Sequence, residues 1–367
     1  MMIVIQRLIR DRVLQITALL VVISLFIGRP KASDISFATL WSILAMMTVI
    51  QIFEHLHILD YWAYRLTSRA NNTRQLTWWF IFLAIFASMF LSNDVTVLTL
   101  VPLYLRVAKK YQLPEILPVT LIGMAANFGS AFTPFGNTHN IFLMHQFEID
   151  LQQFFSWSIP LLGCSFLVLV LLSLFLRNVP VPKVPTEHIH IQMRPTLFAI
   201  AVACVVFAGV IGVVPAWLGA ILAIGLSVAL DPKDMKDVDY AVVLTFAGFF
   251  IIVSVVRQIP WVTHFLSSLI NSEPSVYFSS IITSQAISNV PSTVLLARFT
   301  GYVEALFYGS NIGGVGTLVG SMANLLVFKQ YMIYGSRPHA RFFVGFTIFN
   351  LIGLLILGCA GYWLTIR

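Results

Sequence analysis

Charged residues are scarce in this chain. Asp, Glu, Lys and Arg make up 10% of its 367 residues, whereas hydrophobic residues make up 58%. A typical soluble domain carries about 25% charge, so the composition excludes a soluble protein and predicts a multi-pass membrane protein. The chain has room for roughly ten membrane-crossing elements of about 20 residues each, and no polar stretch is long enough for a separate soluble domain.

Cysteine is also rare. Cys164, Cys204 and Cys359 stand alone in apolar segments, so the sequence predicts neither a disulfide nor a metal cluster. The net charge is +7, but no basic cluster is interleaved with aromatic residues, so we expect no nucleic-acid partner. His-Glu-x-x-His, Gly-x-Ser-x-Gly and P-loop motifs are absent as well, and we therefore expect no enzyme.

One polar pattern occurs twice inside apolar sequence. A Ser-Asn pair is followed further along by a glycine-rich segment that ends in asparagine. Polar, helix-breaking residues inside a membrane cost several kcal/mol unless they line a cavity or are buried in protein. Two matched sets therefore predict one site built from two repeats, the architecture of secondary transporters. The copies are Ser92-Asn93 with 129–140, and Ser288-Asn289 with 313–324.

The apolar segments predict an all-α polytopic membrane protein of about nine spanning helices, two re-entrant hairpins and two broken helices. The apolar runs on either side of the first Ser-Asn pair are each shorter than the roughly 20 residues of a spanning helix, which favours a hairpin. The predicted organisation is a first inverted repeat, 1–177, with hairpin 76–106 and broken helix 116–146; a linker and extra helix, 178–213; and a second inverted repeat, 214–367, with hairpin 276–299 and broken helix 302–328.

The basic residues predict the orientation. If both hairpins enter and leave on one side and the N-terminus is inside, most of the 22 lysine and arginine residues lie inside. Treating both hairpins as full crossings nearly abolishes this bias. We therefore expect a membrane protein with a cytoplasmic N-terminus and an external C-terminus. The basic residues then expected outside are Arg29, Lys31, Arg257, Arg298 and Arg367.

Each break restarts a half-helix, and a helix start offers unpaired N–H groups and a partial positive charge. Four such starts directed at one volume bind an anion without lysine or arginine. Carbonyl groups freed at the breaks, together with asparagine oxygens, are suitable sodium ligands. The predicted substrate-binding residues are Ser92, Asn93, Asp94, Thr138, Ser288, Asn289 and Thr317.

The Ser-Asn-x motif followed by Gly-x-x-x-Thr-x-x-Gly-x-x-x-Asn, present twice, resembles the ion transporter superfamily, which includes divalent anion:sodium symporters, citrate carriers and arsenite permeases. The resemblance covers nearly the whole chain and is greatest to small bacterial inner-membrane permeases. It implies an elevator-type movement in which hairpins and broken helices move together. The residues that it assigns to ion coupling are Asn93, Asp94, Gly136, Asn137, Asn140, Asn289, Gly320, Ser321 and Asn324.

The chain departs from that pattern after each Ser-Asn pair, where Asp94 and Val290 replace threonine. An aspartate beside an anion site should be protonated or paired with a cation, so Asp94 is a candidate for the coupling proton or for sodium. It could also cap the half-helix that starts at Val95. For His139, gating or proton relay and a loop cap are equally open.

These observations together predict a secondary active transporter that moves a small anion, of the carboxylate class, by alternating access coupled to sodium or protons. The alternatives are a proton-coupled exporter of arsenite or another inorganic oxyanion, a sodium/proton exchanger and, ranked below these, an anion channel. We expect membrane lipid as a partner and no cofactor beyond sodium ions, and the sequence leaves a homodimer open.

Overall fold

The computed structural model describes residues 6, 8–9, 11–67, 69–181 and 191–366, so linker residues 182–190 and Arg367 lie outside the described part. Within that part the chain is helical, as predicted, apart from turns and one isolated bridge between Asn72 and Pro180. Five of the described helices are long and apolar enough to cross a membrane, or six if one bent pair counts as a span. The predicted nine crossings stay a prediction.

The helices of the first half run from α2 to α9 and those of the second half from α10 to α18. The first set is α2 (Arg12–Ile27), α3 (Phe37–His55), α4 (Ile58–Thr67), α5 (Thr73–Leu91), α6 (Asn93–Tyr111), α7 (Ile116–Ser130), α8 (Thr138–Phe147) and α9 (Leu151–Ser173). The second set is α10 (Met193–Val210), α11 (Ala216–Leu230), α12 (Tyr240–Val256), α13 (Pro260–Leu269), α14 (Glu273–Ile287), α15 (Asn289–Leu296), α16 (Val303–Gly313), α17 (Met322–Tyr334) and α18 (His339–Thr365).

Helices α5 and α6 meet at Ser92 and fold back on each other. The ring of Phe80 on α5 packs edge-on against Tyr104 on α6, with centroids 5.4 Å apart, and the two residues lie equally far from Ser92. Each helix has 19 residues, and of these two helices α5 is the one that is long and apolar enough to cross a membrane. The hairpin therefore arises from the bend at Ser92 and not, as the sequence suggested, from short helices.

Helices α14 and α15 form the corresponding hairpin around Ser288. The hydroxyls of Thr283 on α14 and Ser292 on α15 contact each other, and the Ser292 hydroxyl also reaches the Ser280 carbonyl oxygen at 3.5 Å. Each hairpin packs against the first half of a broken helix. At Gly313 of α16, a Cβ atom would lie 2.7 Å from the Ser284 side chain, so only glycine allows this close approach.

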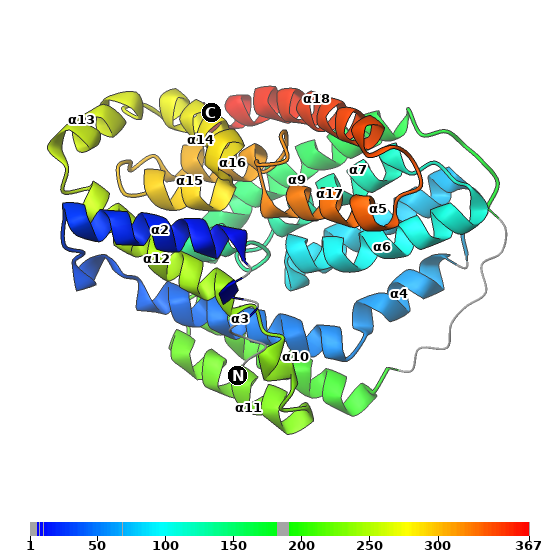
Figure 1. Ribbon diagram of the computed structural model, residues 1–367, viewed down its shortest axis with the longest axis horizontal. Coiled ribbons are helices and arrows are strands. Elements are labelled where there is room, and N and C mark those ends of the chain that lie inside the picture. The colour runs from blue at the N-terminus through cyan, green and yellow to red at the C-terminus, as the bar shows by residue number, and fades with distance from the viewer. Residues whose placement is uncertain (1–5, 7, 10, 68, 182–190, 367) are drawn as a thin grey trace.

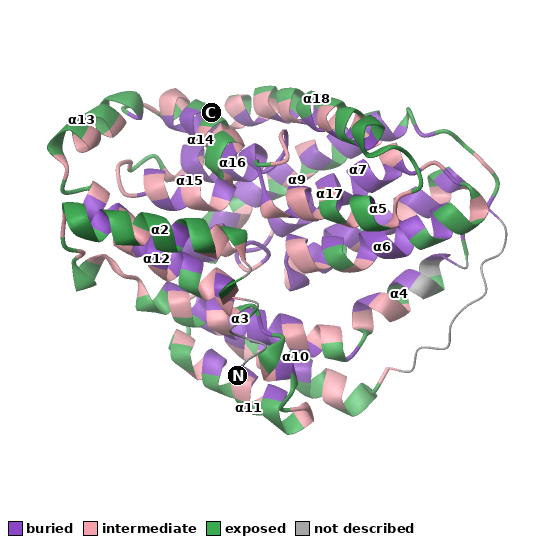
Figure 2. Cartoon of the chain, viewed as in Figure 1, coloured by how far each residue is buried: buried purple, intermediate pink, exposed green. Residues whose placement is uncertain are grey.

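Helices α3, α10 and α11 pack together in the lower part of Figure 1, away from the hairpins. Small residues allow this contact, including Ala45 of α3, Ala203 of α10 and Ala220 of α11. Buried residues gather on α7 and α16, whereas α13 and the outer side of α2 are exposed (Figure 2). The two broken helices thus lie at the centre of the described fold.

Two short helices were not predicted from the sequence, α4 and α13. Both are amphipathic and have 10 residues, which is too short for a run of hydrophobicity to mark them. Helix α13 turns by 103° from α12 and exposes Trp261 and Phe265. Each short helix lies between a long helix and a hairpin, as the chain order and Figure 1 show.

Candidate functional site

Both hairpin bends hold a serine in the same unusual backbone conformation. Ser92 has φ 71° and ψ 158°, and Ser288 has φ 75° and ψ 152°. This region is normally occupied by glycine, and a residue held there costs about 1–3 kcal/mol. Such strain is concentrated at functional sites, and here it occurs at the two matched positions that the sequence singled out.

The four predicted half-helix starts are present, at Asn93 of α6, Thr138 of α8, Asn289 of α15 and Met322 of α17. Asp94 lies in the first turn of α6, where Ser92 is the N-cap residue, so Asp94 does not cap a helix that starts at Val95. Its Oδ1 atom is buried and has no hydrogen-bond partner among the described residues. The Asp94 carboxyl group therefore keeps an unused oxygen beside a helix start.

Two crossed pairs of asparagine amides connect the broken helices. In the first pair, Asn127 of α7 donates from Nδ2 to Asn324 Oδ1 of α17 at 2.9 Å. In the second, Asn311 of α16 donates from Nδ2 to Asn140 Oδ1 of α8 at 3.1 Å. The same spacing in sequence separates Asn127 from Asn140 and Asn311 from Asn324. The first half of each broken helix is therefore bonded to the second half of the other.

Backbone carbonyl groups fix the orientation of the accepting amides. Asn140 Nδ2 donates to the carbonyl oxygens of Ser130 and Thr133, at 3.4 and 3.3 Å. Asn324 Nδ2 donates to those of Gly314 and Thr317, at 3.0 and 2.9 Å. The two sets match position for position. The side-chain oxygens of both asparagines, which the sequence assigned to sodium, each accept a hydrogen bond from the opposite half of the molecule.

Asn127 and Asn311 were missed by the sequence analysis. Each lies in a helix that holds other polar residues, such as Ser130 after Asn127 and Ser310 before Asn311, so neither asparagine stood out as a site residue. The available signal was their equal spacing to Asn140 and Asn324. Because both are buried, with relative exposures of 5% and 7%, their amides are satisfied only by protein partners in this arrangement.

The two Ser-Asn pairs are used differently. Asn93 Nδ2 donates to Asn127 Oδ1 at 2.9 Å, so this amide belongs to the crossed network. Asn289 contributes its backbone N–H instead, which donates to the Gly320 carbonyl at 3.0 Å. The Asn289 side chain has only a long contact from the Ser288 hydroxyl, 3.5 Å, among the described residues. The Asn289 amide nitrogen is thus free to bind a ligand, whereas that of Asn93 is engaged.

The remaining predicted residues shape the loops of the two breaks. Thr317 Oγ1 donates to the Gln285 carbonyl and accepts from the Gly320 N–H, so this hydroxyl supports a turn. At Gly136, a Cβ atom would lie 2.5 Å from the Ser130 carbonyl oxygen, which only glycine avoids.

At the helix starts, Ser321 caps α17 by accepting from the Asn324 N–H. Asn137 is the N-cap residue of α8 but makes no side-chain cap bond. Thr138 is half-buried, and its side chain makes no hydrogen bond to the described residues. The threonine at this start therefore stays a candidate ligand, whereas Ser321 has a structural use.

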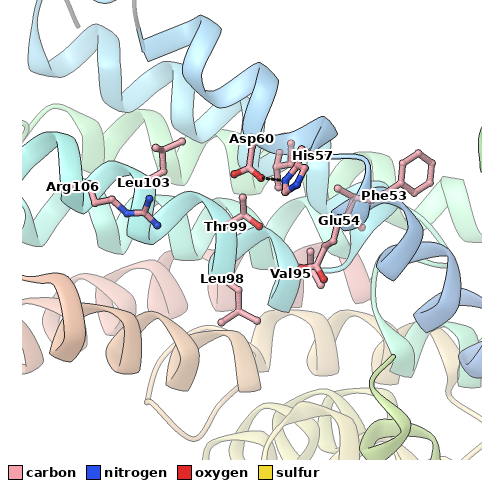
Figure 3. A pocket seen from close by; sticks show the side chains of 11 residues that line it. Phe53, Glu54, His57, Asp60, Val95, Leu98, Thr99, Leu103 and Arg106 are labelled. Atoms are coloured by element: carbon pink, nitrogen blue, oxygen red, sulfur yellow. Dashed lines mark hydrogen bonds and ion pairs between the residues drawn. The ribbon is translucent and has the colours of Figure 1, made fainter. Parts of the chain in front are cut away.

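A cavity of about 300 Å³ lies between the α3–α4 junction and α6. Leu91, just before the first bend, is one of its lining residues. Val95, just after the bend, and Arg106, further along α6, also line it (Figure 3). On the opposite wall, His57 and Asp60 are 3.1 Å apart through Nδ1 and Oδ2. The cavity therefore connects the region of the first helix start with charged groups at the end of the hairpin.

Arg298, the basic residue nearest the second hairpin, makes its contacts away from the bend at Ser288. Arg298 follows α15 and donates to the Asp34 carbonyl oxygen at 2.7 Å. The Asp34 carboxyl group in turn accepts from Ser254 at 2.6 Å and pairs with Arg257 at 3.5 Å. Since Arg298 is held at the far end of α15 from Ser288, positive potential at the bends comes from helix starts and not from arginine.

Comparisons with known proteins find transporters that are similar to this chain. The family model for citrate transporters matches residues 1–304. An uncharacterized transporter of Methanocaldococcus jannaschii is 30% identical over 328 residues, which are 88% of each chain. Inner membrane protein YbiR of Escherichia coli strain K12 is 27% identical over 344 residues, 92% of this chain and 90% of its own.

Two further relatives are more distant. The Na(+)/H(+) antiporter NhaD of Halomonas elongata is 27% identical over 173 residues, 45% of this chain and 35% of the antiporter. Among solved structures, the YdaH transporter of Alcanivorax borkumensis has a TM-score of 0.56 at 15% identity, and the match covers 89% of this chain and 85% of that one. The latter likeness shows a shared fold.

Proposed function

The chain belongs to the citrate transporter family, and we propose from this premise that it moves a small anion of the carboxylate class across the membrane, coupled to sodium or protons. It is a transporter of the ion transporter superfamily and not an enzyme. The observation that best supports an anion is that four helices begin at the bends and breaks with no lysine or arginine in their first turns, since helix N-termini bind anions without a basic side chain.

The proposed anion site lies at the two bends. Ser92 and Ser288 lie there with strained backbone conformations, and the Asn289 amide nitrogen is available as a donor. A carboxylate accepts hydrogen bonds from such amide, hydroxyl and backbone N–H groups, and these bonds are stronger than those between neutral partners. Thr138, which has no structural use, is a further donor at the start of α8.

The coupling cation is proposed to bind near the same starts. The unused Asp94 oxygen is a suitable ligand for sodium or a site for a proton, because an ionised carboxyl group inside a membrane requires one of the two. Carbonyl oxygens at Gly136 and Gly320 lie in the two breaks and are further candidates for sodium. The oxygens of Asn140 and Asn324 keep one lone pair each after their amide bonds.

Alternating access is proposed to move the hairpins and broken helices together against α3, α10 and α11. The crossed amides bond the two broken helices to each other, and the hairpins pack against these helices. Helices α4 and α13 connect the hairpins to the long helices α3 and α12. The cavity between α4 and α6 then gives the first bend a path to one side of the membrane. On the predicted orientation, with inverted repeats 1–177 and 214–367, this side is the cytoplasm of a bacterial cell.

An inorganic oxyanion exporter and a sodium/proton exchanger remain the second candidates. The observation that favours the exchanger is the similarity to the NhaD antiporter, which covers 45% of this chain. An exchanger needs no anion, so it predicts sodium-dependent and proton-dependent stabilisation in the absence of any carboxylate. A homodimer in the inner membrane is compatible with each of these functions.

A thermal-shift screen of the purified protein tests the proposal. The ligands are citrate, succinate, phosphate, sulfate and arsenite, each with sodium and with potassium at two pH values. A ligand at one hundred times its dissociation constant stabilises the folded state by about 2.7 kcal/mol. Counterflow of the radiolabelled hit into proteoliposomes then distinguishes a transporter from a channel.

Stabilisation by a carboxylate, lost in Asn289→Ala, is the expected result. Stabilisation by arsenite alone would favour an exporter. Stabilisation by sodium and pH alone, with no response to any anion, would contradict the proposed anion site and favour the exchanger.

A further inference from the structure

Gln285 of α14 holds the loop of the second broken helix with its side chain. Its Nε2 donates to the carbonyl oxygens of Gly313 at 2.7 Å and Val315 at 3.0 Å, and its Oε1 accepts from the Thr317 N–H at 2.8 Å. A third contact, to the Ile281 carbonyl oxygen of its own helix, is longer, 3.4 Å. A carbonyl oxygen only accepts and a backbone N–H only donates, so these partners determine the orientation of the amide. The second break thus contains an amide nitrogen that faces its carbonyl oxygens.

Met89 of α5 has the same position in the first half, three residues before the serine of the bend. The Met89 carbonyl oxygen accepts from Thr133 Oγ1 at 2.6 Å. In the second half, the Gln285 carbonyl oxygen accepts from Thr317 Oγ1 at 3.3 Å. The two positions therefore correspond in their contacts as well as in sequence. The thioether of methionine has no N–H group to donate, so Met89 provides no counterpart of the Gln285 amide.

The carbonyl groups of the two breaks differ in their hydrogen bonds. The Val315 carbonyl oxygen accepts from that amide, and the Gly320 carbonyl oxygen accepts from the Asn289 N–H at 3.0 Å. At the corresponding positions of the first break, the carbonyl oxygens of Ala131 and Gly136 accept no hydrogen bond from any residue that the structure describes. Both residues are buried, and buried backbone carbonyl groups are nearly always paired. The first break therefore keeps carbonyl oxygens for a ligand.

Asp94 adds a carboxyl group to the first half at the position where the second half has Val290. Asp94 Oδ1 is buried and has no hydrogen-bond partner among the described residues. An ionised carboxyl group and unpaired carbonyl oxygens inside a membrane require a positive partner. A valine side chain and carbonyl oxygens that already accept from N–H groups require none. The two matched regions thus differ in their need for a cation.

We propose that the Gln285 amide takes the place of a second sodium ion, so that the chain binds a single sodium ion, at the first break. Carbonyl oxygens freed where a helix unwinds are sodium ligands in transporters, and the first half offers them and a carboxyl group. In the second break, the N–H groups of Gln285 and Asn289 are directed at the corresponding oxygens, so a cation would have to displace them. This inference rests on the proposed cation-coupled transport and specifies its cation.

This assignment divides the two ligands between the two halves. The cation belongs to the first break and Asp94, whereas the free amide nitrogen of Asn289 is a donor for the anion at the second bend. Opposite charges bound in one site attract each other, so sodium raises the affinity for the anion. By reciprocity, the anion raises the affinity for sodium by the same factor. The Gly320 carbonyl oxygen, a candidate for sodium by its place in the motif, then serves the backbone at the start of α15.

Equilibrium binding of radioactive sodium to the purified protein, with and without citrate, counts the ions directly. The wild type should saturate at a single ion per chain. Met89→Gln introduces an amide that can donate to the carbonyl oxygens of the first break, and this variant should bind no sodium. Met89→Leu, which has a similar volume and no amide, is the matched control and should keep the ion. Two ions in the wild type, or full capacity in Met89→Gln, would overturn the proposal.

Gln285→Glu tests the second break by the gain of an ion. The carboxylate has the same shape but no N–H group, so the Gly313 and Val315 carbonyl oxygens then face another oxygen and require a cation. This variant should bind two sodium ions and show greater stabilisation by sodium in thermal unfolding. A capacity that stays at one ion would overturn the assignment of Gln285, and this result decides the question if Met89→Gln does not fold.

The outcomes separate this inference from the transport proposal. A wild-type protein that transports citrate but binds no sodium, or binds two ions, would overturn only the assignment of a single sodium ion. A wild-type protein that binds one sodium ion and no anion would overturn the proposed anion transport and leave the sodium assignment in place.

Discussion

Removing the Asn127 side chain tests whether the crossed amides hold the two halves together. Asn127→Ala abolishes two short hydrogen bonds, to Asn324 and from Asn93, each 2.9 Å, and one longer bond to Gly314. Hydrogen bonds between helices in membranes average about 0.6 kcal/mol and reach about 1.7. The partners left without a bond add about 1–3 kcal/mol. We expect a loss of about 2–4 kcal/mol in the free energy of unfolding.

Asn350 on α18 provides the matched control. It is equally buried, but its Nδ2 donates only to the Phe346 carbonyl oxygen in its own helix, at 2.9 Å. Asn350→Ala removes the same volume and should cost less than about 1 kcal/mol in hydrogen bonding. Reversible unfolding in mixed micelles measures both variants. Equal losses, within about 0.5 kcal/mol, would refute the view that the pairs between halves are the stronger contacts.

Three further pairs of substitutions address the bends and the breaks. Gly136→Ala should destabilise by about 1–3 kcal/mol through overpacking, whereas Gly163→Ala, which meets nothing within 4 Å, should stabilise by up to about 1 kcal/mol; thermal unfolding compares them. Because Ser288 has a φ of 75°, Ser288→Gly should relieve about 1 kcal/mol of backbone strain and Ser288→Val should not; equal melting temperatures of the two variants would contradict this. Asn289→Ala should abolish stabilisation by ligand but leave the unliganded melting temperature unchanged, while Asn93→Ala should lower both.

The positions of the breaks were predictable from the sequence because polar residues inside apolar runs have few physical solutions. Half-helices start at Asn93 and Asn289, and the helices around the two breaks run over 116–147 and 303–334, where the sequence analysis placed 116–146 and 302–328. The amphipathic helix α13 was not predictable by the same reasoning, since a short half-polar segment resembles a loop. Strong, long hydrophobic patterns thus predict elements, and short ones do not.

The pairing of side chains was harder to predict than the breaks. The motif predicts equal roles for Asn93 and Asn289 because they occupy equal positions in its two copies. In the structure, Asn93 reaches Asn127, whereas His139 occupies the corresponding acceptor on Asn311. Because His139 stands in the first copy where Ala323 stands in the second, the Asn289 amide is left free. Such an effect depends on which repeat faces which, and this is a property of tertiary contacts and not of a motif.

The crossed amides also have a consequence for how the molecule is made. A ribosome completes the first half, with Asn127 and Asn140, before it produces Asn311 and Asn324. Until then the Asn127 amide nitrogen and the Asn140 side-chain oxygen lack their amide partners, and an unpaired polar group in lipid is costly. The newly inserted first half should therefore stay loosely packed, or depend on an insertase, until the second half arrives. Expressed alone, it should be degraded; co-expressed as two fragments, the halves should rescue each other.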